Sequence, residues 1–369
     1  MKFTTKKISI VLFISCLLLC SCTNDDILDD NSMIIVDENN IYGVDIEQEK
    51  LVINRTKSRE KDDYGLWYYN NLFFENETAY FTKTSTDRNL DVWIEKIDKA
   101  NFNITRKKHT SIDTNCALLT DDYYYVVNNF ISNLKIDVYD MNLNLVKTVD
   151  FSYDNNSSIY PTDLIEVNGS IYMLCGIIPD NSEFGYTENY IFKLDTQFNI
   201  VEKYDLCENQ GSFFSFVYAN KKIYLTHTTS NINDERMALG SNEIYVFDLE
   251  EEKILDEKIT LNTAFPFDIH YDECNNNLII SHGDNGPSSN HIWTVYDLDT
   301  YSETIIPIDF LEFKEGMPVR SAFFASGVSE YYLLFPDCLC VYDIETKKST
   351  TYKLDEYGID DAVLIVLNE

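Results

Sequence analysis

A single pattern of apolar and polar positions recurs along the chain: an apolar strand, an Asp, a polar turn and a second strand. Two clear examples are IYVFDLEEEKILDEKI from position 244 and WTVYDLDTYSETIIPI from position 293. The Asp of this pattern stands at positions 45, 98, 140, 195, 248, 297 and 343, at spacings of 42 to 55 residues. Repeats of about 40–50 residues with four strands each are typical of β-propellers. The pattern therefore predicts an all-β chain made of four-stranded antiparallel sheets.

The two ends of the chain predict how such a ring would close. Six complete sets of four strands can be followed, beginning near Leu66, Asn115, Asp163, Phe213, Phe267 and Arg320. Three further strands precede them, starting with Met33–Val36, and one apolar strand, Ala362–Leu367, follows them. One strand plus three makes a seventh set. We therefore expect a seven-bladed propeller closed by the C-terminal strand, because closure removes two open sheet edges.

The first residues have the pattern of an export signal. Three Lys fall within residues 1–7, and the apolar run 8–19 is too short to span a bilayer. Leu19-Cys20-Ser21-Cys22 resembles the lipobox of bacterial lipoproteins, which implies that Cys22 becomes a lipid-bearing N-terminus. An ordinary secretory signal cut nearby is the alternative.

These features divide the chain into three parts. Residues 1–21 are expected to be a lipoprotein signal peptide, 22–32 an acidic tether and 33–369 the propeller. The expected location is extracytoplasmic, with the lipid on Cys22 inserted in the cell membrane or the outer membrane.

The repeats resemble those of seven-bladed WD40-like and YVTN-type propellers of exported bacterial proteins. The resemblance covers Met33 to Glu369 and rests on endings such as VYD and VFD. The Gly-His and Trp-Asp dipeptides of true WD40 repeats are absent. The resemblance implies the fold and carries over no catalytic residue.

Charge narrows the range of partners. The net charge is −33, and removal of the Lys-rich signal makes the remainder more acidic still. Such a field repels phosphate backbones, so nucleic acid is excluded as a partner, whereas cationic ligands are favoured. Solubility alone also explains the charge. No GxSxG, P-loop, GxGxxG or HExxH motif occurs, so no cofactor is expected.

Six cysteines follow Cys22, at positions 116, 175, 207, 274, 338 and 340. They fall in different predicted blades, except for the last two, whose spacing would strain a disulfide. No CxxC or Cys/His spacing indicates a structural metal. We expect buried thiols rather than bridges.

The predicted ligand site is the axial mouth, at the starts of the inner strands. Tyr160-Pro161-Thr162-Asp163 aligns with Phe265-Pro266-Phe267-Asp268, with Met317-Pro318-Val319-Arg320 and with Phe213–Phe216. The candidate residues at this mouth are Tyr160, Asp163, Phe216, Asp268, Arg320 and Asp361. Carboxylates, an Arg and aromatic faces suit a cation, a peptide or a sugar. The alternative is that the Asp residues only cap adjacent backbone.

Two histidines give an alternative function. His227 and His282 both end second strands in adjacent predicted blades, and Asp284 follows closely. Such groups could serve a lactonase, lyase or glycan-active hydrolase as general acids and bases, or hold a metal. A scaffold in a cell-envelope complex is a third alternative. We favour a binding protein, because the spacing of these residues matches no catalytic motif.

Overall fold

A computed structural model describes most of the chain beyond the tether. The described residues are 32–37, 39–59, 73–75, 78–84, 92–109, 114–130, 133–151, 157–179, 188–206, 211–232, 238–283, 292–308, 323–360, 362 and 364–367. The predicted signal peptide, Cys22, Arg320 and Asp361 lie outside them.

The described strands form seven antiparallel sheets, numbered here along the chain. Sheet 1 holds β29 (Leu364–Leu367), β1 (Met33–Val36), β2 (Asn40–Glu47) and β3 (Lys50–Ser58). Sheet 2 holds β4 (Phe73–Glu75), β5 (Thr78–Thr84), β6 (Val92–Asp98) and β7 (Ile104–His109). Sheet 3 holds β8 (Thr114–Leu119), β9 (Tyr123–Phe130), β10 (Asn133–Asp140) and β11 (Leu145–Phe151).

The other four sheets repeat this order. Sheet 4 holds β12 (Ser157–Val167), β13 (Ser170–Pro179), β14 (Glu188–Leu194) and β15 (Ile200–Asp205). Sheet 5 holds β16 (Ser212–Ala219), β17 (Lys222–Ile232), β18 (Ala238–Asp248), β19 (Lys253–Ile254) and β20 (Ile259–Thr260). Sheet 6 holds β21 (Pro266–Asp272), β22 (Asn277–His282), β23 (Ile292–Asp297) and β24 (Ser302–Ile305). Sheet 7 holds β25 (Phe323–Ser326), β26 (Glu330–Leu334), β27 (Cys338–Asp343) and β28 (Lys348–Lys353), and is followed by the 3-10 helix η1 (Leu354–Tyr357).

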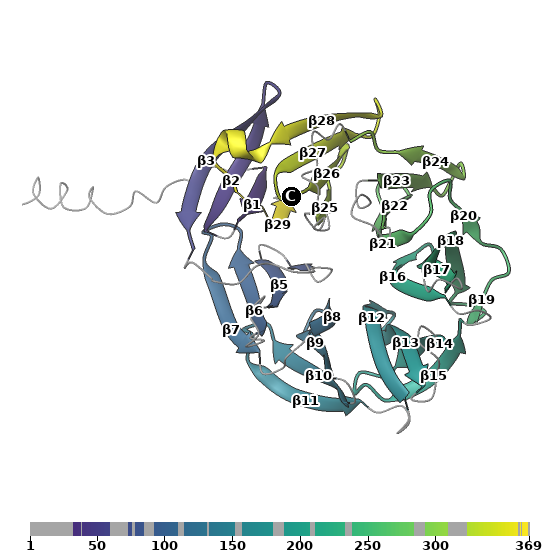
Figure 1. Ribbon diagram of the computed structural model, residues 1–369. Helices are drawn as coiled ribbons and strands as arrows, with labels where there is room; N and C mark the ends of the chain where they lie inside the picture. The colour runs from purple at the N-terminus through teal and green to yellow at the C-terminus, as the bar shows by residue number, and fades with distance from the viewer. Residues whose placement is uncertain are drawn as a thin grey trace, which may run out of the picture.

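The sheets stand side by side around a central axis (Figure 1). The first strand of each sheet lies toward the axis and the last toward the rim, as β12 and β15 show. The predicted all-β propeller is confirmed. β29 pairs antiparallel with β1, with Val36 opposite Leu364 and Met33 opposite Leu367. Within the described ranges, no helix has the length and apolar character needed to cross a membrane.

The core lies between the faces of neighbouring sheets. Sheets 3 and 4 share one cluster that includes Val127, Ile136, Met173 and Phe192, all fully buried. Comparable clusters join each of the other neighbouring pairs, including sheets 7 and 1. Each buried aliphatic or aromatic side chain of this kind contributes about 1.5–3 kcal/mol. Apolar burial therefore stabilises every one of these interfaces.

The repeated Asp caps the turn between the third and fourth strands in six of the seven sheets, whereas Asp45 accepts from the Ser32 N–H and the Asn54 side chain. The Asp140 carboxylate accepts hydrogen bonds from the backbone N–H groups of Asn142 and Asn144, at 2.9 and 2.8 Å. Asp195 repeats this with Gln197 and Asn199, at 2.9 Å each. A hydrogen bond from the Asn144 side chain holds the pKa of Asp140 below its usual range. The strongest sequence signal thus has a local structural cause.

The cysteine expectation holds for four of the five described thiols. Cys116, Cys175 and Cys338 are buried and free, and Cys340 is buried. Cys274 is free but exposed, which corrects the expectation for that residue. It lies in the β21–β22 turn, where its N–H donates to the Asp272 carboxylate at 3.0 Å. The turn conformation, and not packing, fixes its position.

Candidate functional site

Strand pairing gives the true register of the inner strands. Asp163 stands four residues before the end of β12, as Ser215 does in β16 and Asp268 in β21. In each strand a bulge interrupts the pairing beside this position. Ser215, and not Phe216, is therefore the counterpart of the two Asp residues. The sequence alignment misses this by one residue, because β16 has Phe213 where β12 and β21 have the Pro residues that guided the alignment.

Asp163 joins sheet 4 to sheet 5. Its Oδ2 accepts hydrogen bonds from the Ser215 hydroxyl at 2.7 Å and the Phe216 N–H at 3.0 Å. Its Oδ1 accepts one from the Leu164 N–H at 2.8 Å. Burial raises the pKa of Asp163 to about 6, although the three hydrogen bonds favour the charged form. The carboxylate thus bonds the backbone of the next sheet, as in the capping alternative.

The other described members of the mouth differ in their exposure. Phe216 is 2% exposed and packs in the core between sheets 4 and 5. Asp268 is 7% exposed, and its N–H donates to the Ser281 hydroxyl at 2.9 Å. Tyr160 is 39% exposed. Among these residues, Tyr160 offers an aromatic face to solvent, whereas Phe216 does not.

The two histidines occupy equivalent places at the ends of second strands. His282 is 1% exposed; its Nδ1 lies 3.0 Å from the Ala264 carbonyl oxygen and its Nε2 2.8 Å from the Thr294 hydroxyl. Burial lowers its pKa to about 4. Both ring nitrogens are therefore engaged within the protein, and the ring is neutral at pH 7.

His227 has a different environment. It is stacked on Phe213, with ring centroids 4.7 Å apart, and its Nδ1 lies 3.5 Å from the Glu243 carboxylate. Burial lowers its pKa, while the Glu243 charge opposes this shift. Gly211 packs directly on the ring, where a Cβ would lie 2.4 Å from Nε2. The imidazole is thus enclosed by aromatic rings and backbone.

The remaining predicted partners lie outside the described residues. These are Arg320, Asp361 and Asp284, so their convergence with the histidines stays a prediction. Within the described ranges, no three His, Cys, Asp or Glu side chains come together as metal ligands.

A pocket that the sequence pattern does not predict lies on the face of the ring opposite the axial mouth. It has a volume of about 470 Å³ and lies between sheets 3 and 4. The lining residues are Thr120, Asp121, Asp122, Tyr123, Tyr125, Val138, Val146, Lys147, Glu166, Ile171, Thr196 and Gln197. They lie in the turns between first and second strands and between third and fourth strands, or on the adjoining strands, whereas the predicted mouth uses the other loops. A comparison of turn residues between repeats could have found it.

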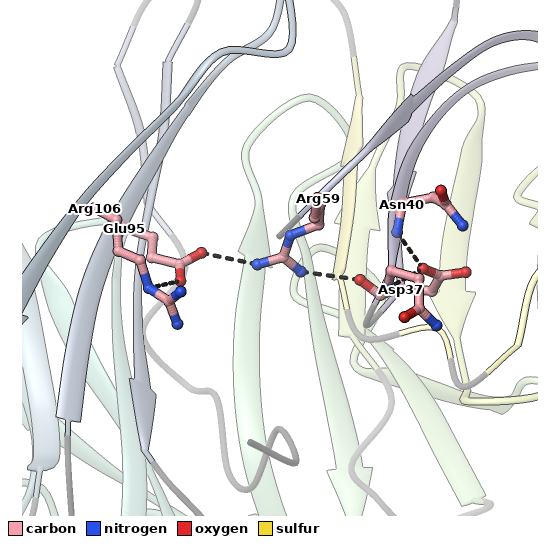
Figure 2. A network of polar contacts seen from close by, with 6 residues as sticks. Asp37, Asn40, Arg59, Glu95 and Arg106 are labelled. Atoms are coloured by element: carbon pink, nitrogen blue, oxygen red, sulfur yellow. Dashed lines mark hydrogen bonds and ion pairs between the residues drawn. The ribbon is translucent and has the colours of Figure 1, made fainter. Parts of the chain in front are cut away.

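A second polar feature joins the sheet that contains both chain ends to its neighbour (Figure 2). Glu95 is completely buried, and its carboxylate lies 2.9 Å from the Arg59 guanidinium and 3.0 Å from that of Arg106. Arg59 also donates to the Asp37 carbonyl oxygen at 2.9 Å. The Arg106 guanidinium lies over the Trp93 ring, 4.2 Å from its centroid. The network connects the ends of β1 and β3 to the β6–β7 hairpin, and so it stabilises the contact between sheets 1 and 2.

Comparison with known proteins supports the fold. No protein-family model and no curated protein sequence matches the chain. A "putative 6-phosphogluconolactonase" from Bacteroides fragilis superimposes with a TM-score of 0.59 at 10% identity, over 91% of this chain and 97% of that one. A second, from Bacteroides uniformis, gives 0.58 at 12% identity, over 91% and 98%. The dihydro-heme d1 dehydrogenase NirN gives 0.53 at 14% identity, over 92% and 75%. These likenesses show a propeller fold and no more.

Proposed function

We propose that the chain is a lipid-anchored, extracytoplasmic, seven-bladed propeller that binds a ligand or protein partner without catalysing a reaction. We favour binding over catalysis because of the hydrogen bonds and the pKa of His282. Both of its ring nitrogens are within hydrogen-bond distance of protein oxygens, and its pKa is near 4. A general acid or base needs a free nitrogen and a pKa near the working pH.

The proposed ring has seven blades, closed by the pairing of β29 with β1. The proposed anchor is a lipid on Cys22, from the resemblance of Leu19–Cys22 to a lipobox. The proposed ligand site is the axial mouth, where exposed Tyr160 would act with Arg320 and Asp361. A charged pair beside an aromatic face suits a peptide, a sugar or a cation.

Membrane fractionation tests the anchor. Replacing Cys22→Ala should move the protein from the membrane fraction to the soluble fraction. A variant that stays in the membrane fraction would contradict lipidation, as would a native N-terminus other than Cys22.

A thermal-shift screen of the native chain tests ligand binding. A ligand that binds only the folded state raises the melting temperature by mass action. Sugars, peptides and metal ions are the probes, and Tyr160→Ala and Arg320→Gln should abolish the shift at the axial mouth. A shift that survives both changes would place the site elsewhere.

A lactonase assay tests the catalytic alternative, because two structural neighbours bear that name. We expect no hydrolysis of 6-phosphogluconolactone. The net charge of −33 repels a phosphorylated substrate, and His282 offers no free nitrogen. Hydrolysis lost on His282→Gln would overturn the binding proposal.

A further inference from the structure

At the other interfaces, side chains of the protein fill the place where the pocket lies between sheets 3 and 4. The residue after the repeated Asp points back toward the preceding sheet. In five sheets this residue is apolar and packs in the interface cluster: Ile46, Met141, Leu249, Leu298 and Ile344. In sheet 2 it is Lys99, which is 8% exposed and donates to the Leu367 carbonyl oxygen at 3.4 Å. In sheet 4 it is Thr196, which is exposed and lines the pocket.

At each interface, a residue of the preceding sheet faces the residue that follows the repeated Asp. The identity of this facing residue explains the rest of the pocket. This position lies two residues before the repeated Asp and is Lys in sheets 2 and 4. Lys96 donates from Nζ to the Met141 carbonyl oxygen of sheet 3 at 2.8 Å. Lys193 donates to the Glu252 carboxylate of sheet 5 at 2.5 Å. Both ammonium groups therefore span the gap to the next turn.

Sheet 3 has Val138 at this position, and Val138 lines the pocket. Strand pairing supports the equivalence, because a bulge directly follows both Val138 and Lys193. Sheets 5, 6 and 7 also have Val there, but their valines face the apolar residues Leu298, Ile344 and Ile46. Among the described interfaces, the one between sheets 3 and 4 therefore pairs two short side chains, the apolar Val138 and the polar Thr196, and these leave the pocket open.

The charges around the pocket favour a cation. Three carboxylates line it, those of Asp121, Asp122 and Glu166, against one ammonium, that of Lys147. Tyr123 and Tyr125 form one wall, with ring centroids 6.0 Å apart. Tyrosine faces attract ammonium groups and pack on aliphatic stems.

We propose that this pocket binds a lysine side chain of a peptide or protein partner. The partner's ammonium group takes the place that Lys96 and Lys193 occupy at the neighbouring interfaces, beside Glu166 and the turn at Thr196. Its aliphatic stem lies against Tyr123 and Val146. This site is separate from the axial mouth, since the two lie on opposite faces of the ring.

Peptide titration of the native chain tests the proposal. The probe is the pentapeptide acetyl-Gly-Gly-Lys-Gly-Gly-amide, followed by saturation-transfer nuclear magnetic resonance, and the control peptide has norleucine in place of lysine. We expect the lysine peptide to bind at least about tenfold more tightly, the usual value of one charge-assisted hydrogen bond. Equal affinities, or no binding of either peptide, would overturn the proposal.

Variants of the chain locate the binding. Val138→Lys places a lysine from the protein itself in the gap, so it should remove peptide binding while leaving the melting temperature equal or higher. Glu166→Gln should weaken binding about tenfold, and Lys147→Met should strengthen it by removing a like charge. Glu202→Gln is the control, because it changes the net charge equally at a residue that does not line the pocket. This variant should bind the lysine peptide with native affinity. Equal loss from Glu166→Gln and Glu202→Gln would show general electrostatic attraction and refute the site.

If Val138→Lys binds the lysine peptide as tightly as the native chain does, the proposed site is also refuted. Tyr160→Ala and Arg320→Gln, which test the axial mouth, should leave this binding unchanged. Failure of one site therefore does not imply failure of the other.

Discussion

At the residue scale, the polar groups near the axis serve the fold. The Asp163 carboxylate accepts bonds from the Ser215 hydroxyl and the Phe216 N–H of the next sheet. His282 is likewise engaged at both nitrogens. A residue that breaks an apolar pattern can therefore mark a bond between sheets as readily as a ligand site.

Asp163 gives the first prediction. Asp163→Ala leaves the Ser215 hydroxyl and two N–H groups, those of Phe216 and Leu164, without their acceptor, and should cost about 1–3 kcal/mol of unfolding free energy. Asp163→Asn keeps an acceptor and should cost less. Urea unfolding of both variants measures the difference. Native stability in Asp163→Ala would contradict the bonding role.

The pH dependence of the same residue gives a second prediction. The folded pKa of Asp163 is raised from 3.8 to about 6, so the folded state holds its proton more tightly than the unfolded chain. Stability of the native chain should therefore fall as the pH rises from about 4 to about 6, relative to Asp163→Asn. Parallel unfolding curves for the two proteins across this window would contradict the shift.

His270 gives a prediction of opposite sign. Its ring is stacked on Phe324, with centroids 4.7 Å apart, and burial lowers its pKa from 6.5 to about 4. The unfolded chain therefore binds the proton more readily, and this contribution to stability is lost as the pH falls from about 6.5 toward about 4. His270→Phe keeps an aromatic ring and removes the titration. The variant should match the native chain at pH 7 and exceed it at pH 5 in urea unfolding. A variant that loses as much stability as the native chain on acidification would exclude His270 as a source.

At the scale of elements, turns and buried ion pairs join one sheet to the next. The repeated Asp caps the turn in six of the seven sheets, and the residue after it contacts the preceding sheet in every sheet except sheet 4. The network of Arg59, Glu95 and Arg106 then connects the sheet that contains both chain ends to sheet 2. Both devices act between neighbours in sequence.

The ion network gives the element-scale prediction. Glu95→Ala leaves Arg59, whose side chain is 3% exposed, without its carboxylate, and should cost about 3–5 kcal/mol. The control is Asp150→Asn at the exposed pair with Lys135, which should cost less than about 1 kcal/mol. Thermal and urea unfolding measure both. Similar costs for the two changes would show that burial of the network contributes nothing.

At the scale of the whole molecule, the first and last described strands share one sheet. β29 pairs with β1 across more than 300 residues of sequence, and its side chains belong to the clusters on both sides. A contact this remote in sequence carries a large entropic cost of loop closure, which the buried apolar surface must offset.

Truncation tests this pairing. Deleting residues 360–369 removes β29, exposes the edge of β1 and uncovers two clusters. We expect the cooperative thermal transition to be lost, as followed by circular dichroism and calorimetry. Deleting only residues 368–369 is the control and should leave melting unchanged. A melting temperature unaffected by the longer deletion would refute the proposed ring closure.

The sequence by itself determined the all-β character of the chain and the grouping of its strands in antiparallel fours. These follow from local causes: alternation of apolar residues along each strand, and an Asp that caps the turn in most repeats. Only the tertiary structure decided the chemistry. The register that makes Ser215 the counterpart of Asp163 depends on pairing with the adjacent strand, and the engagement of His282 depends on Ala264 and Thr294. The pocket depends on Val138 and Thr196, which lie on different sheets. Each of these facts is a relation between distant segments, and a sequence read in order does not contain their distances.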